Sequence, residues 1–209
     1  MSLRGRLFAA TYDRMVAKTE EAGLSALRED LIARATGDVL EIGAGTGANL
    51  GLYGSDVTSL TVTEPEPPML KRLERHVKEE APRAKVLRAP AEDLPFNDNC
   101  FDTVVSTLVL CGVNDQPRAL RELRRVLRPG GRLIFLEHVR SDEVKLARWQ
   151  DRMNALNRFM VCCECNRPTL ETIKAVGFEV TQLERGTMPK APPFVRPLII
   201  GTATSGPAG

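Results

Sequence analysis

The sequence has no hydrophobic run long enough to cross a membrane. Its longest stretches without a charged residue span about a dozen residues, as at 103–114, whereas a membrane-spanning helix needs roughly 20. The first residues, MSLRGRLF, also lack the apolar segment and the small-residue cleavage site of a signal peptide. From these two absences we expect a cytoplasmic protein without a transmembrane segment.

The chain also has little net charge. It carries 29 Lys and Arg against 27 Asp and Glu, which leaves +2 at pH 7. So mild a balance gives no argument for nucleic acid or an anionic membrane as a partner, and we expect no nucleic-acid partner. We interpret the arginines at 118, 121, 124, 125 and 128 as the solvated face of a helix.

Cysteine is scarce, and its number is odd. An odd count, here five, argues against a disulfide framework in a cytoplasmic chain. Cys162, Cys163 and Cys165 form one tight cluster, without the second cluster or the nearby histidine that structural zinc sites use. We therefore expect no metal site.

The length of 209 residues fits one domain over 1–209. Residues 1–36 show helical spacing with a break near Gly23. Short apolar strands then alternate with amphipathic helices, which is typical of an α/β fold with a parallel sheet. We expect strands at 38–42, 58–63, 85–88, 101–106, 132–136, 178–183 and 198–202, and helices at 69–77, 117–127, 145–160 and 168–176.

A glycine-rich loop follows the first expected strand. Gly43, Gly45 and Gly47 leave room for a ligand to approach the backbone. Glu64 ends the second strand, where a carboxylate can accept both hydroxyls of an adenosine ribose. Enzymes that bind NAD and enzymes that bind S-adenosylmethionine share this device. Tyr12 and Tyr53 lack a lysine four residues later, which excludes the Tyr-x-x-x-Lys centre of short-chain dehydrogenases.

Five motifs in a fixed order favour enzymes that bind S-adenosylmethionine over enzymes that bind NAD. The motifs are VLEIGAGTG (39–47), EPE (64–66), APAEDLPF (89–96), FD (101–102) and VLRPGG (126–131). Together they resemble the class I S-adenosylmethionine-dependent methyltransferases, in the subgroup of the ubiquinone/menaquinone-biosynthesis C-methyltransferases.

A further set of motifs comprises GAN (47–49), STLVLCGV (106–113), LEHV (136–139), WQ (149–150) and CN (165–166). This set is similar to the methyltransferase-like family of thiol methyltransferases in animals. These resemblances imply a Rossmann-like three-layer sandwich with a mostly parallel seven-stranded sheet, order 3-2-1-4-5-7-6, whose last strand is antiparallel. They also imply N-terminal helices over 1–36 that cover the cofactor, a cofactor-binding half at 37–140, and an acceptor segment with the last strands at 141–203.

The resemblance further implies how S-adenosylmethionine is held. The glycine loop would face methionine and ribose, Glu41 the methionine amino group and Glu64 the ribose hydroxyls. The residues implied to bind the cofactor are Glu41, Gly43, Ala44, Gly45, Thr46, Gly47, Asn49, Glu64, Pro65, Met69, Ala91, Glu92, Thr107 and Leu108.

The acceptor side is predicted from position in the fold. His138 ends the fifth strand, at the edge that faces the active site, and is the candidate catalytic base. Tyr12, Cys111, Trp149 and Gln150 are the candidates for binding the acceptor. The alignment of acceptor, methyl carbon and sulfur, with water excluded, is the main task of such an enzyme.

Three functions follow from the sequence. The first is methyl transfer from S-adenosylmethionine to a small molecule, with a thiol ahead of a quinone or another natural product as acceptor. The second is a nicotinamide-binding oxidoreductase, and the third is a cofactor-binding protein without turnover. The sequence is compatible with a monomer.

Overall fold

The computed structural model describes residues 17–161 and 163–206. Seven strands form one sheet in the order β3-β2-β1-β4-β5-β7-β6. Strands β1 to β5 are parallel, whereas β7 runs antiparallel to both β5 and β6. The predicted Rossmann-like sheet, its order and its antiparallel last strand are confirmed. The strands are β1 Gly37–Ile42, β2 Val57–Thr63, β3 Lys85–Leu87, β4 Phe101–Thr107, β5 Leu127–His138, β6 Glu179–Thr187 and β7 Pro197–Thr204.

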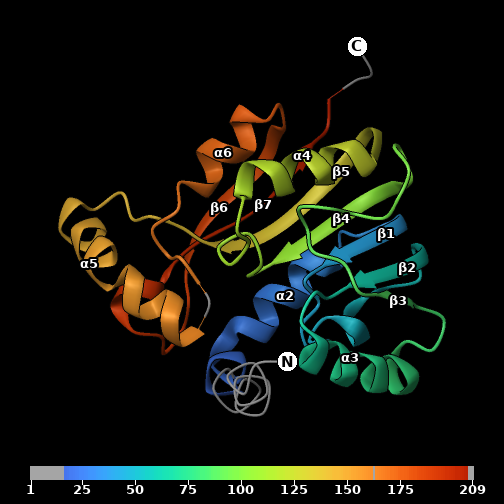
Figure 1. Ribbon diagram of the computed structural model, residues 1–209, viewed down its shortest axis with the longest axis horizontal. Coiled ribbons are helices and arrows are strands. Elements are labelled where there is room, and N and C mark those ends of the chain that lie inside the picture. The colour runs from blue at the N-terminus through green and yellow to red at the C-terminus, as the bar shows by residue number, and fades with distance from the viewer. Residues whose placement is uncertain (1–16, 162, 207–209) are drawn as a thin grey trace.

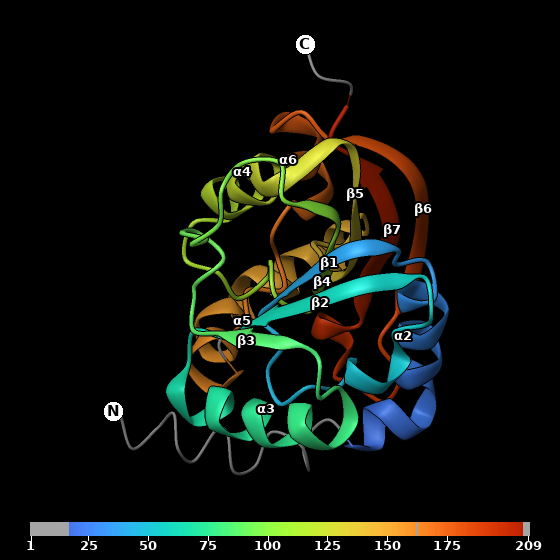
Figure 2. The same ribbon diagram turned by 90° about the vertical axis from the view of Figure 1, so that its right-hand side faces the viewer.

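Helices cover both faces of the sheet, as Figures 1 and 2 show. Helices α4 and α6 lie on one face, α2 and α3 lie on the other, and α5 lies beyond the carboxyl ends of the parallel strands. The helices are α2 Ser25–Ile32, α3 Pro67–Glu80, α4 Gln116–Val126, α5 Val144–Val161 and α6 Thr169–Ala175, with short turns η1 Glu20–Leu24, η2 Leu50–Leu52 and η3 Pro193–Val195.

Helix α4 shows how the sequence sets these layers. Asp115 caps it by accepting a hydrogen bond from the Arg118 backbone N–H at 2.9 Å, and a proline follows within the first turn. Leu120 and Leu123 are fully buried against the sheet. The predicted helix at 117–127 therefore begins one residue earlier, at Gln116, and ends at Val126.

The fifth strand is longer than its apolar pattern predicts. The expected strand at 132–136 extends from Leu127 to His138, because Leu127 also pairs with Phe101 of β4 before the register shifts. His138 is the last residue of β5 and pairs with Leu198 of β7. The chain after β5 thus leaves the sheet beside the carboxyl end of β4.

The N-terminal segment has the break expected near Gly23. Gly23 has φ 127° inside the π-helical turn η1, and helix α2 follows it. Leu24, Leu31 and Ile32 pack under the central strands. The predicted site residue Tyr12 lies outside the described residues. None of the helices described here is long and apolar enough to span a membrane.

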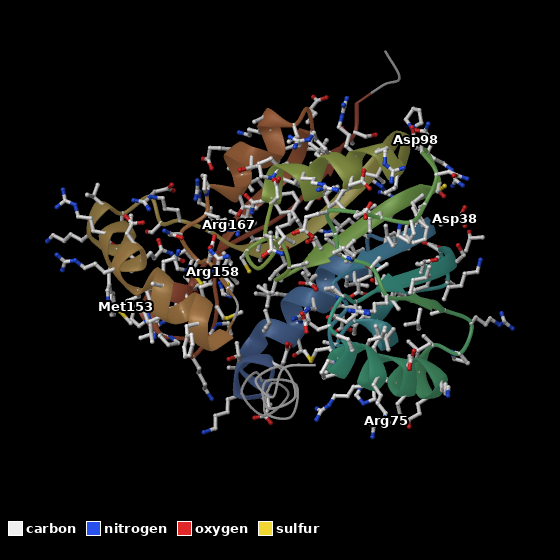
Figure 3. The ribbon with its side chains drawn as sticks, in the orientation of Figure 1. Asp38, Arg75, Asp98, Met153, Arg158 and Arg167 are labelled. Carbon is white, nitrogen blue, oxygen red and sulfur yellow. The ribbon has the colours of Figure 1, made fainter. Side chains whose placement is uncertain are left out.

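The two ends of the sheet differ in their chemistry. At the amino ends of the strands, Arg128 bridges Asp38 at 2.9 Å and Asp102 at 2.5 Å. Figure 3 places Asp38 and Asp98 at this end, away from Arg158, which belongs to α5, and from Arg167. The charged network at the amino end ties strands together, and the carboxyl end holds the residues that the sequence assigns to the site.

Candidate active site

The glycine loop leaves the carboxyl end of β1 in a backbone that only glycine adopts easily. Gly43 has φ 56° and Gly47 has φ 100°. A Cβ on Gly43 would lie 2.7 Å from both methyl groups of Val109, and one on Gly47 would lie 2.6 Å from Leu50 Cδ1. The loop is therefore packed from below, and it carries no side chain at these positions that would keep a ligand away.

Glu64 lies against this loop from the end of β2. Its Oε2 accepts a hydrogen bond from the Gly45 backbone N–H at 3.0 Å, and its Oε1 accepts one from Glu66 at 2.9 Å. The side chain is buried, and this burial raises the pKa of Glu64 to about 7. A buried carboxylate beside side-chain-free backbone is the environment that a ribose diol requires.

Glu41 lies at the centre of a buried polar network below the loop. Its Oε1 accepts a hydrogen bond from Asn49 Nδ2 at 2.8 Å, and its Oε2 accepts one from the Tyr53 hydroxyl at 2.6 Å. Burial raises the pKa of Glu41, and these two donors act in the opposite direction. The carboxyl group is held in one orientation before any ligand arrives.

The network reaches the N-terminal helix through Arg28. Its guanidinium donates to Thr107 Oγ1 at 2.9 Å and to Asn49 Oδ1 at 3.2 Å, and it pairs with Glu20 at 3.2 Å. Arg28 and Tyr53 were not among the predicted site residues. For Arg28 the signal was present, since a lone arginine interrupts the apolar helix positions between Leu24 and Leu31.

The predicted adenine-side residues surround the loop at different distances. A Cβ on Gly45 would lie 3.9 Å from Met69 Cε, so Met69 borders the loop. Ala91 is buried. Pro65 is half-buried, and its carbonyl accepts a hydrogen bond from Arg88 Nε at 3.0 Å. Glu92 accepts one from the Asn114 N–H at 2.7 Å, so it also fixes the loop after β4.

Other predicted contacts lie within the loop itself. The Ala44 N–H donates to the Thr63 carbonyl at 2.9 Å, which joins the loop to β2. The Thr46 carbonyl lies 2.7 Å from His76 Nδ1. His76 thus contacts the backbone of the glycine loop from helix α3.

The turn after β4 is strained at a predicted site residue. Leu108 has φ 61°, a left-handed conformation that is uncommon for a side chain of this size. Its N–H donates to the Leu136 carbonyl at 2.7 Å. Glu137 accepts hydrogen bonds from Ser106 Oγ at 2.7 Å and from the Val109 N–H at 3.1 Å. The strain is therefore maintained by the neighbouring strand β5.

His138 lies at the carboxyl end of β5 and is 7% exposed. Burial lowers its pKa to about 4, although hydrogen bonding to the backbone at Val195 and Pro197 acts the other way. The imidazole is therefore neutral at physiological pH. Its Nδ1 is buried and has no hydrogen-bond partner among the described residues.

Three cysteines gather beside this histidine. Cys163 Sγ lies 3.4 Å from Cys165 Sγ. Cys111 lies against Cys163, and the contact with its neighbours and burial together raise the pKa of the Cys163 thiol well above its ordinary value. A ligand atom of His138 and the sulfurs of Cys163 and Cys165 all lie within 4.8 Å of one another. The sequence argument against a metal used the separation of histidine and cysteine along the chain, and the fold removes that separation.

Trp149 and Gln150, predicted to bind the acceptor, lie on α5 with different surroundings. Trp149 is 42% exposed and makes an edge contact with Phe194, with 5.6 Å between ring centroids. Gln150 is buried, and its amide donates to the carbonyls of Val139 and Cys165, both at 2.9 Å. Gln150 therefore joins the end of β5 to the cysteine segment.

A surface cavity of about 420 Å³ opens next to the cysteines. Its wall includes Gly112, which follows Cys111, and Glu164, which lies between Cys163 and Cys165. Glu164 forms ion pairs with Arg158 of α5 and with Arg167, both at 2.7 Å, and Figure 3 labels these two arginines near each other. The cavity is thus lined by sequence neighbours of the cysteines and not by the cysteines themselves.

Comparisons with known proteins agree with this geometry. The methyltransferase domain family matches residues 40–135. The thiol S-methyltransferase TMT1A of Homo sapiens is 32% identical over 207 residues, which cover 94% of this chain and 82% of that relative. The ubiquinone/menaquinone biosynthesis C-methyltransferase UbiE of Geotalea daltonii is 36% identical over 107 residues, which cover 51% of this chain and 43% of that relative.

A solved structure shows the same fold over its whole length. The S-adenosylmethionine-dependent methyltransferase of Thermotoga maritima matches with a TM-score of 0.72 at 23% identity, covering 98% of this chain and 100% of the other. This chain belongs to the class I S-adenosylmethionine-dependent methyltransferases. Its cofactor is S-adenosylmethionine, and the open glycine loop with the buried Glu64 carboxylate fits that molecule.

Proposed function

We propose that this enzyme methylates the sulfur atom of a small thiol. The observation that carries the proposal is the extent of the likeness to a thiol S-methyltransferase. It covers 94% of this chain and so includes the acceptor segment, whereas the likeness to the quinone C-methyltransferase covers 51%. The acceptor segment is where enzymes of one fold differ in substrate.

The cofactor is held by the residues that the motifs indicate. Glu64 accepts hydrogen bonds from the ribose hydroxyls, and Glu41 faces the methionine amino group. The loop 43–47 and Asn49 line the part of the cofactor that lies between the ribose and the methionine amino group. Pro65 and Met69 pack on the adenine, Ala91 and Glu92 border its edge, and Thr107 and Leu108 contact the methionine portion. The supporting observations are the buried Glu64 beside Gly45 and the Met69 side chain beside the same loop.

The protein's task in the reaction is to align the acceptor and keep water out. The cofactor supplies a methyl group on a positively charged sulfur, which is a good leaving group. The acceptor sulfur must lose its proton, and an ordinary thiol has a pKa of about 8.5. His138 is neutral and buried at this side of the site, where it helps to position the acceptor sulfur while the thiol proton passes to solvent. Trp149 and Cys111 border the acceptor.

Methyl transfer from labelled S-adenosylmethionine to a small alkyl thiol tests this proposal. We expect labelled thioether that depends on both thiol and enzyme, and we expect His138→Ala to lower the rate while S-adenosylhomocysteine still binds. A reaction without thiol is the control for background. Cofactor binding with no thioether product would overturn the thiol assignment.

Quinol C-methylation is the second candidate, because the match to UbiE is 36% identical over the half that it covers. A quinol analogue is therefore run beside the thiol under the same conditions. Labelled product with the quinol alone would replace the first proposal with the second. Product with neither acceptor would direct the search to other natural products.

A further inference from the structure

A histidine and two cysteines from different elements converge at the acceptor side of the site. His138 ends β5, and Cys163 and Cys165 follow α5. Their ligand atoms lie within 4.8 Å of one another, and the two sulfurs are 3.4 Å apart. Two sulfurs that each lie about 2.3 Å from a tetrahedral zinc are about 3.8 Å apart. The observed separation is thus close to that of a bound pair.

The second, independent observation is the orphaned nitrogen of His138. The side chain is more than nine-tenths buried, yet Nδ1 has no hydrogen-bond partner in the described part of the chain. A buried polar atom without a partner is rare and requires an explanation. Hydrogen bonding to the backbone at Val195 and Pro197 orients the imidazole, as a carbonyl does for metal-bound histidines. A bound cation would satisfy the remaining nitrogen.

The surrounding residues support the cysteines as ligands. Asn157 Nδ2 donates to Cys165 Sγ at 3.2 Å and to the Cys163 carbonyl at 2.7 Å. Gln150 Nε2 holds the Cys165 carbonyl at 2.9 Å. An N–H donor aimed at sulfur stabilises a thiolate, and these bonds fix the segment that carries both sulfurs.

We propose that His138, Cys163 and Cys165 bind one thiophilic divalent cation, with Zn²⁺ as the natural candidate, and that its fourth position takes the acceptor thiolate. Soft sulfur ligands with one imidazole select such ions. Three protein ligands with one open position are the arrangement of catalytic rather than structural zinc. Cys111 contacts Cys163 but is not among the atoms that converge within 4.8 Å, so it does not fill the fourth position.

The open position gives the cation a chemical role, and this part rests on the proposed thiol methylation. A thiol that binds the cation gives up its S–H proton to solvent and remains as a thiolate. Its lone pair then forms the new bond to the methyl carbon, and the bond between that carbon and the sulfonium sulfur breaks with its electron pair on sulfur. The neutral thioether is a weak ligand and leaves.

Metal content is the first test. The full-length protein is purified in a phosphine reductant, stripped with a chelator and titrated with Zn²⁺. We expect one Zn²⁺ per chain, and Co²⁺ should give sulfur-to-cobalt charge-transfer bands. Cys163→Ser and Cys165→Ser should each lower the affinity by more than the roughly 10- to 100-fold that loss of an outer partner costs, and Asn157→Ala should fall within that range. Stripped protein that binds neither ion would overturn the site.

Matched cysteine variants separate the ligands from their neighbours. Cys100 lies at the other end of β4, where its thiol donates to the Asn97 carbonyl at 3.1 Å, so Cys100→Ser should bind Zn²⁺ like the parent. Cys111→Ser should also keep the ion. Loss of Zn²⁺ from this variant would show that Cys111 is a fourth ligand, and it would overturn the open position for the acceptor. Binding of S-adenosylhomocysteine by each variant verifies that it is folded.

Addition of a small alkyl thiol to the Co²⁺ protein tests the fourth position. We expect stronger sulfur-to-cobalt charge-transfer absorption, because the thiolate of the added thiol binds Co²⁺ in addition to the two cysteine sulfurs. An unchanged spectrum in a protein that methylates the thiol would overturn the open position while leaving thiol methylation intact. Metal binding without any thiol product would overturn the proposed function and keep the cation site.

Discussion

The hydroxyl of Tyr53 donates a hydrogen bond to Glu41 Oε2, with 2.6 Å between the two oxygens. Tyr53 lies just beyond the short turn η2, whereas Glu41 belongs to β1. The hydrogen bond therefore joins the segment that follows the glycine loop to the strand that precedes it. Burial and the adjacent carboxylate raise the pKa of Tyr53 well above its ordinary value. The phenol therefore stays protonated and remains a donor.

Replacing the Tyr53 hydroxyl should lower both the stability of the protein and its affinity for the cofactor. Tyr53→Phe removes one hydrogen bond to a buried carboxylate, so we expect a loss of about 1–3 kcal/mol in the free energy of unfolding and weaker binding of S-adenosylhomocysteine. Denaturant unfolding and calorimetry measure the two effects. Glu41→Gln and the double variant complete a mutant cycle, and additivity within about 0.5 kcal/mol would show that the two residues do not interact.

Arg28 should couple the N-terminal helix to the site. Arg28→Met keeps the aliphatic stem but removes the bonds to Thr107 and Asn49. We expect a loss of about 1–3 kcal/mol in stability and weaker binding of S-adenosylhomocysteine. Arg34→Met is the matched control, because Arg34 makes one exposed bond to Gln182 at 2.9 Å and such changes stay within about 0.5 kcal/mol. Equal effects in the two variants would contradict the coupling.

The glycine loop should not tolerate even a methyl group at its first position. In Gly43→Ala the new Cβ would meet Val109 at 2.7 Å in a left-handed backbone. The conformation alone costs about 1–2 kcal/mol, and we expect loss of cofactor binding as well. Gly54→Ala is the control, since a Cβ there has nothing within 4 Å. Normal cofactor binding by Gly43→Ala would show that the glycine loop does not bind the cofactor.

Cofactor binding should strengthen as pH rises through about 7. The pKa of Glu64 in the free protein is raised to about 7 by burial, and the ribose hydroxyls need the ionised carboxylate as acceptor. If only that form binds, the affinity for S-adenosylhomocysteine at pH 6 is about 10-fold weaker than at pH 8. Calorimetry at both values measures it. Glu64→Gln is the control, because any ionisation of S-adenosylhomocysteine itself affects both proteins equally. This variant should bind without the change near pH 7. Identical pH profiles of binding in the two proteins would refute Glu64 as the ribose-binding carboxylate.

The stability of the free protein should change in the opposite direction. A carboxyl group whose folded pKa lies above its unfolded value of 4.5 favours the folded state in its neutral form. That contribution is complete below pH 4.5 and is lost as pH rises through about 7. In the absence of ligand, Glu64→Gln should therefore lose less stability than the parent over this interval, as thermal unfolding at several pH values can show.

Most of the fold could be predicted because its signals are local. Apolar strands separated by amphipathic helices define the parallel sheet, and Gly43, Gly45 and Gly47 mark the turn where a ligand approaches. Even the break at Gly23 follows from one residue type. The strand β5 was predicted too short, since the pairing of Leu127 with Phe101 depends on a neighbour and not on the strand's own pattern.

The site was predicted less completely because its contacts join distant segments. Arg28 meets Thr107 across 79 positions of sequence, and no local pattern indicates such a bond. The same applies to His138 and the cysteines at 163 and 165, which the sequence separates and the sheet brings together. Gln150 was predicted to border the acceptor, and the structure gives its amide several backbone partners instead of an open side chain.

The position of β7 between β5 and β6 also has a consequence for the order in which this protein matures. β7 begins at Pro197, near the end of the chain, yet it pairs with β5 through Leu198 and His138. On a ribosome that adds about 5–20 residues per second, His138 emerges seconds before its sheet partner. Until β7 has been made, the edge of β5 that includes His138 therefore lacks its strand partner.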